Sequence, residues 1–201
     1  MVDHADLDVP EDTANVGRDA WEAAALRLFD DKYSLVATGP RVHSDWLLDA
    51  VAVMNRDFVD PRGWRVLDWD RDNADEIARH GHAFPFDSPS TELLNESLTQ
   101  ITSETAPLLL VAMTDDWCNL RNAPGFPDRA ESLIADAHTL LARYGQQFEC
   151  YSNANDVETA PVPHLACKVS GWSALTQYTA DYGLVVVSDA EVGIFWSFNP
   201  I

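Results

Sequence analysis

The stretch Pro107-Leu-Leu-Leu-Val-Ala-Met-Thr-Asp-Asp-Trp-Cys118 joins an apolar run of strand length to a short polar end. An apolar run without alternation is typical of a strand that is covered on both faces of a sheet. We therefore predict that residues 107–113 form the central strand of the fold. The carboxylates, the tryptophan and the thiol that follow would lie just beyond its carboxyl end, where open α/β sheets usually bind ligands.

The segments that follow this stretch predict a helix and further strands. Apolar residues recur at helical spacing in 128–144, and a strand pattern follows at 147–152. Strand, helix and strand at this spacing indicate a right-handed βαβ crossover. Two apolar runs, 183–188 and 192–198, flank a short turn and predict a C-terminal β-hairpin. Further helices are expected over 18–32, from Ser44, over 73–80, from Ser88 and over 172–182, and further strands over 34–38, 64–69 and 165–170.

These elements predict one α/β or α+β domain over residues 14–201, with a mixed β-sheet flanked by helices and a C-terminal β-hairpin. A hydrophobic fraction of 46% is enough for a sizeable core. Residues 1–13 contain five acids and Pro10, so we expect an acidic flexible tail.

Charge is the strongest compositional signal, because 33 acidic residues against 13 basic ones give a formal net charge of −20. From Tyr144 to the C-terminus, Lys168 is the only base. Such a surface repels nucleic acid and anionic lipid, and it attracts a basic protein or a cationic ligand. A general preference for Asp and Arg over Glu and Lys is the alternative explanation.

Cysteine content and hydropathy indicate the compartment. Three cysteines are few and odd in number, which argues against a disulfide framework. The N-terminus has neither a basic start nor an apolar core, so no signal peptide is expected, and no apolar run reaches the length of a membrane span. We expect a cytoplasmic protein.

Asp115 and Asp116 are candidates for a metal site or for acid–base chemistry. Paired carboxylates supply the oxygen ligands that Mg²⁺ prefers, or an acid and a base. Consecutive residues point in different directions, so a metal would need further carboxylates, and Asp70 and Asp72 follow another predicted strand. A solvated loop in an Asp-rich protein is the alternative. No cofactor is predicted, since glycine-rich phosphate loops, dinucleotide fingerprints and Cys-x-x-Cys pairs are missing from the sequence.

Cys118 is a candidate nucleophile, because a thiol in a polar loop ahead of a helix can be activated by a histidine base. His138 and His164 are the histidines that the fold could bring near it. The alternative is a half-buried small side chain beside Trp117.

The segment from 107 to 171 resembles the thioredoxin fold in the order of its predicted elements. Trp117-Cys118 resembles the start of that family's redox motif, and Pro163, ahead of the strand at 165–170, resembles the proline that faces the motif. The resemblance implies a thioredoxin-like topology. Arg121 stands where the second cysteine of the motif would fall, so redox activity does not follow from it.

Aromatic residues are concentrated in the C-terminal thirty residues, among acids and almost no bases. Exposed aromatics beside carboxylates suit the capture of a basic protein, and an aromatic-rich core is the alternative. The candidate partner-binding residues are Trp172, Tyr182, Glu191 and Trp196. Two functions therefore stay open: a non-enzymatic, inhibitor- or immunity-type binding domain, and a small enzyme with a carboxylate–metal or cysteine-based site at the end of the predicted strand.

Overall fold

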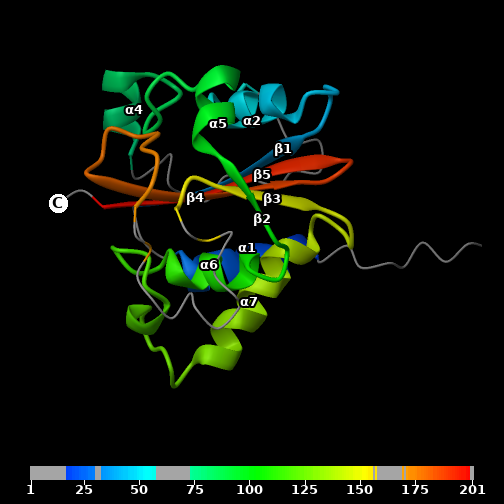
Figure 1. The fold of residues 1–201 in the computed structure, drawn as a ribbon, viewed down its shortest axis with the longest axis vertical. Helices are drawn as coiled ribbons and strands as arrows, with labels where there is room; N and C mark the ends of the chain where they lie inside the picture. The colour runs from blue at the N-terminus through cyan, green and yellow to red at the C-terminus, as the bar shows by residue number, and fades with distance from the viewer. Residues whose placement is uncertain are drawn as a thin grey trace, which may run out of the picture.

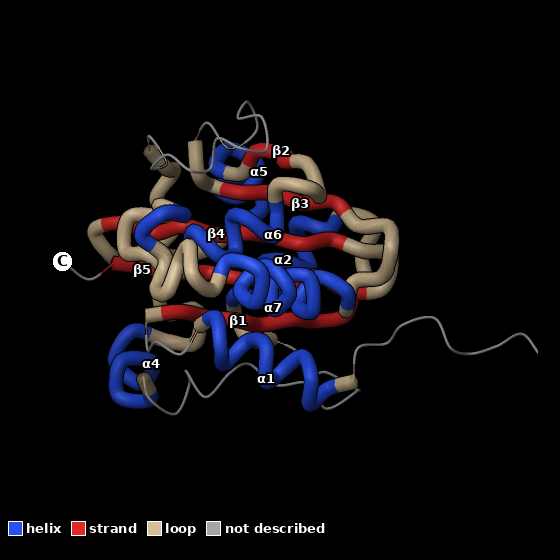
Figure 2. The backbone as a smooth tube through the Cα atoms, turned by 90° about the horizontal axis from the view of Figure 1, so that it is seen from below, coloured by secondary structure: helices blue, strands red, loops and turns tan. Residues whose placement is uncertain are grey.

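Five strands form one sheet in the order β1-β5-β4-β3-β2, and each described pair of neighbours is antiparallel (Figure 2). The strands are β1 (Ser34–Pro40), β2 (Thr99–Ile101), β3 (Glu149–Ser152), β4 (Ala180–Val187) and β5 (Glu191–Asn199). This computed structural model describes residues 17–29, 33–57, 73–155, 157, 169 and 171–199. The predicted single domain with a C-terminal hairpin is confirmed, since β4 and β5 pair from Ala180↔Asn199 to Val187↔Val192.

Helices cover both faces of the sheet (Figure 1). On one face lie α1 (Arg18–Leu28), α6 (Ala106–Ala112) and α7 (Ala130–Ala142), and on the other lie α2 (Trp46–Met54), α4 (Ala74–His80) and α5 (Thr91–Ser97). A short 3₁₀ helix, η1 (Leu120–Asn122), follows α6. Because both faces are covered, β4 is buried at every position, although its residues alternate between the two layers.

Each helical layer has its own apolar core against the sheet. The first core joins the buried stripes of α1 and α7 to α6 and to the strand residues Tyr182, Leu184 and Phe195. The second core joins α2 and α5 to strand residues of opposite parity, Val185 and Trp196 among them. The helices expected at 18–32, from Ser44, at 73–80, from Ser88 and at 128–144 are all present, with shorter bounds.

The prediction of a central strand at residues 107–113 is wrong, because this segment is helix α6. Pro107 lies in the first turn of the helix, where its missing N–H removes no hydrogen bond. Leu109, Leu110 and Ala112 have high helix propensity, and all three are fully buried. An apolar run cannot distinguish a covered strand from a helix that is buried on every side. Here α6 packs against both the sheet and α7, and six of its seven residues are buried, so it has no polar face.

Three predictions that depended on the central strand are also wrong. The βαβ crossover is wrong, because α7 leads into β3, which pairs antiparallel with β2 and β4. The sheet is antiparallel rather than mixed throughout its described strands. The thioredoxin-like order is wrong for 107–113, which supplies a helix where that topology needs a strand. Residues 172–182 are not helical either: they form bends that lead into β4 at Ala180.

Several predictions concern residues outside the described part of the chain. They are the tail at 1–13, the strand at 64–69, Asp70, Asp72, Pro163, His164 and most of the strand at 165–170. Among the described residues, no helix is long and apolar enough to cross a membrane.

Candidate functional site

Asp115 and Asp116 follow α6, in a tight turn that leads towards η1. The Asp115 carboxylate accepts hydrogen bonds from the backbone N–H groups of Trp117 and Asn119, both at 3.1 Å. The Asp116 side chain is exposed, and its backbone carbonyl accepts from Asn199 at 3.4 Å. Asp115 therefore stabilises the turn locally.

No three His, Cys, Asp or Glu side chains gather into a metal-binding group among the described residues. Asp70 and Asp72 lie outside that part of the chain. The four-carboxylate metal site therefore stays a prediction.

Cys118 lies in the core of the α6 layer, with none of its surface exposed. Its backbone has a φ of 52°, so the turn directs the side chain inward from a left-handed conformation. Burial raises the pKa of the Cys118 thiol far above its usual range, and the charge of Asp115 raises it further. A nucleophilic cysteine needs the opposite environment, one that stabilises the thiolate. His138 is exposed on α7, and His164 is outside the described residues.

The four candidate partner-binding residues lie mainly in the core instead of on the surface. Tyr182 and Trp196 are buried in opposite layers, and Glu191 is buried at the start of β5. Trp172 is half-buried, with its ring edge-on to Tyr182 at a centroid distance of 5.2 Å. Strand alternation exposes one side only when one face of the sheet is bare, and here helices cover both.

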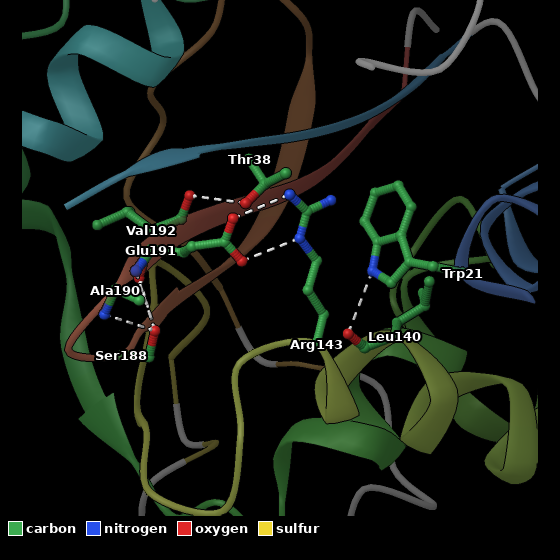
Figure 3. Close-up of polar contacts among 8 residues, drawn as sticks. All are labelled: Trp21, Thr38, Leu140, Arg143, Ser188, Ala190, Glu191 and Val192. Atoms are coloured by element: carbon green, nitrogen blue, oxygen red, sulfur yellow. Dashed lines mark hydrogen bonds and ion pairs between the residues drawn. The ribbon is translucent and has the colours of Figure 1, made fainter. Parts of the chain in front are cut away.

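Glu191 forms a buried ion pair with Arg143, the C-cap residue that directly follows α7 (Figure 3). Arg143 donates from Nε to one carboxylate oxygen at 3.0 Å and from a terminal nitrogen to the other at 2.9 Å. Its guanidinium also lies 5.1 Å from the ring of Trp21, whose indole N–H donates to the Leu140 carbonyl at 3.3 Å. This bidentate pair joins α1, α7 and β5 inside the fold, so its role is structural.

A surface hollow of about 610 Å³ lies at the end of the sheet where β4 turns into β5, opposite the end of β5 at Asn199. Four segments line it: the loop after β1, the β4–β5 turn, the segment that leads into β3, and Ser103 in the loop after β2. The first three of these lie on the right of Figure 1. The backbone N–H of Arg41 donates to the Ala190 carbonyl at 2.8 Å, which joins the first two. The residues that line the hollow include Arg41, Ser103, Gln147, Glu149, Ser188 and Asp189.

Hydrogen bonds fix the walls of the hollow. Arg41 is half-buried, and its guanidinium donates to the carbonyls of Ser188 at 3.2 Å and Ser44 at 3.3 Å. Glu149 accepts from the Tyr151 hydroxyl at 2.9 Å. Burial is the main cause that raises the pKa of Tyr151 to about 12, and this hydrogen bond to Glu149 is the second cause. The hydroxyl therefore remains a donor. The Tyr151 ring stacks on the ring of Trp46, at the start of α2, with a centroid distance of 4.4 Å.

Beside the hollow, a histidine and a buried aspartate hold the loop between β1 and α2. The Asp49 carboxylate accepts from the backbone N–H groups of Val42 and His43 at 3.2 Å each, and it lies 2.6 Å from the His43 Nδ1. Asp49 is 2% exposed, whereas Val42 is 71% exposed. The loop is therefore held rigidly and presents an apolar side chain to solvent.

Neither the hollow nor the His43–Asp49 pair was found by sequence reasoning. The residues of the hollow come from four separate parts of the chain, and no local motif connects them. The six-residue spacing of His43 and Asp49 spans a loop and the first turn of a helix, and it matches no helical or strand period.

Comparison of the chain with models of protein families, with curated proteins and with solved structures gave no match.

Proposed function

We propose that this protein is a non-enzymatic, acidic binding domain that captures a basic protein, as inhibitor- and immunity-type proteins do. The observation that carries the proposal is the excess of carboxylates on the surface of a chain with a net charge of −20. Exposed acids occur on elements of both helical layers and at the hollow, and they include Asp19, Asp45, Asp75, Glu96, Glu104, Asp128, Glu131, Glu149 and Asp189.

Four of the eight arginines in the described part of the chain are paired with carboxylates. Arg143 is buried against Glu191, and Arg27 forms a short ion pair with Asp136 at 2.6 Å. Arg18 and Arg79 each pair with a glutamate on their own helix. Since acids outnumber bases 33 to 13 in the whole chain, the excess of carboxylates sets the field that an approaching protein meets. Such a field accelerates association with a basic partner and disfavours an acidic one.

A cytoplasmic location belongs to the same proposal. Cys118 and Cys150 are both free and buried. Reduced thiols of this kind fit a compartment in which disulfides do not persist.

The enzymatic alternative rests on residues 114–118. There, Asp115 stabilises its own turn and the Cys118 thiol is buried with a raised pKa. Because neither residue is placed for catalysis there, these observations support the non-enzymatic binding domain better than the enzyme.

The proposal is tested by measuring equilibrium binding of the purified chain to a panel of purified basic proteins that includes cationic nucleases. A true partner should bind at least about a hundredfold more tightly than the other panel members at about 0.15 M salt, and markedly less tightly at about 0.5 M. A matched acidic polypeptide such as polyglutamate serves as the control for charge alone. Uniformly weak binding across the panel, or tight binding that is indifferent to salt, would count against the proposal.

A further inference from the structure

The hollow at the β4–β5 turn offers an incoming side chain both space and negative charge. Glu149 and Asp189 belong to its lining and are exposed. Glu104 is also exposed and directly follows the lining residue Ser103. Arg41 is the basic residue in the lining, and two of its N–H groups already donate to the carbonyls of Ser188 and Ser44. The carboxylates therefore outnumber the cation at this site.

Two aromatic side chains, Tyr151 and Trp46, lie next to one of these carboxylates, Glu149. The Tyr151 hydroxyl donates to Glu149, and the Tyr151 ring stacks on the half-buried Trp46. These contacts hold the Glu149 side chain in place before any partner arrives. Aromatic rings can also pack along the aliphatic stem of a long cationic side chain, or lie against a guanidinium.

Two exposed apolar side chains lie on the adjoining loop and in the first turn of α2. Val42 directly follows Arg41, and Leu48 lies in the first turn of α2; their exposed fractions are 71% and 46%. Because Asp49 fixes this loop through two backbone N–H groups, Val42 is presented at little cost in conformational entropy. Charged acceptors, aromatic rings and apolar side chains within one surface are the components from which protein interfaces are built.

We propose that this hollow receives an arginine or lysine side chain of the basic protein partner. In this arrangement Glu149 and Asp189 accept hydrogen bonds from the cation, and Trp46 with Val42 contacts the surrounding partner surface. The assignment rests on the proposed function and specifies which surface performs it.

The first experiment uses a defined probe, arginine capped at both ends as N-acetyl-arginine amide, and NMR of the full chain. Capped arginine should shift the amide signals of residues 146–149 and 187–189, and capped norleucine, of similar length but uncharged, should leave them unchanged. Shifts with inorganic phosphate and none with capped arginine would overturn the proposal, because the hollow would then be an anion site centred on Arg41.

The second experiment compares two double variants in binding to the tightest basic protein of the panel. Glu149→Gln with Asp189→Asn removes the two charges of the hollow. Asp128→Asn with Glu131→Gln removes two exposed charges near the start of α7, in the layer on the other face of the sheet. Both pairs change the net charge equally and conserve side-chain shape, and thermal unfolding checks that each variant is folded.

The hollow pair should weaken binding about tenfold or more, and the control pair by about twofold or less. An equal loss in the two would overturn the hollow as the docking site and leave the proposed function standing. Should no panel protein bind, the proposed function fails, and the capped-arginine experiment still decides whether the hollow accepts a cation.

Discussion

The close packing of Trp196 over Gly183 gives a sharp test of the two-layered sheet. These residues are opposite each other in the β4–β5 hairpin. A Cβ atom added at Gly183 would lie 1.9 Å from Cζ3 and 2.0 Å from Cε3 of the Trp196 ring. Ordinary carbon–carbon contacts are about 3.5–4.0 Å, so the indole would have to move away by roughly 2 Å.

The indole ring has no free space to move into, because Trp196 is fully buried and its ring lies edge-on to that of Phe86 at a centroid distance of 5.3 Å. We therefore expect Gly183→Ala to lower the free energy of unfolding by about 3 kcal/mol, the upper end of the usual cost of overpacking. In a Trp196→Leu background, the clashing ring atoms are gone, and the same change should cost less than about 1 kcal/mol.

Urea unfolding followed by circular dichroism measures all four members of this double-mutant cycle. Gly17→Ala is the control, since among the described residues no atom outside its chain neighbours lies within 4 Å of the added Cβ. It should change stability by no more than about 1 kcal/mol. A cost for Gly183→Ala that is equal in the two backgrounds, or below about 1 kcal/mol in the wild type, would refute the packing described here.

Two further predictions concern the buried ion pair and the buried thiols. Glu191→Gln should lower the free energy of unfolding in urea by about 3 kcal/mol, because the Arg143 side chain has no exposed surface and loses its charged acceptor. A decrease of less than about 1 kcal/mol would contradict a buried pair. In a Cys167→Ser variant, Cys118 and Cys150 should resist an aromatic disulfide reagent at about pH 8 until urea unfolds the chain. Burial raises the pKa of Cys150 to about 12, whereas an unfolded thiol ionises near about 8.5. Stability should therefore fall as the pH rises above about 8.5, since the unfolded state loses its protons first. Native thiols that react at the rate of a free cysteine would refute this prediction.

Sequence patterns predicted the elements whose periodicity was unambiguous. The hairpin of β4 and β5 follows from two β-branched and aromatic runs around a polar turn, and α7 follows from the spacing of Leu133, Ala137, Leu140 and Leu141. The run at 107–113 carried no periodicity, because six of the seven residues of α6 are buried. Only its tertiary contacts with the sheet and α7 distinguish the helix from a central strand.

The candidate site was harder to predict, because burial decides the role of each residue. Glu191 and Trp196 suited an exposed recognition surface as residue types, yet both are buried under helical layers that the sequence does not place. The sequence around Cys118 suited a nucleophile in a polar loop. In the structure, the left-handed φ of Cys118 directs its side chain into the core. The hollow depends on contacts such as Arg41 with Ser188, which are 147 residues apart and leave no local pattern.

Hydrogen exchange of the chain with and without its tightest basic panel protein tests the central claim most directly. Binding through the hollow predicts slower exchange in residues 41–49, 146–151 and 187–191, with the α7 layer unchanged. Protection confined to α1, α6 or α7, with the hollow unchanged, would contradict the account.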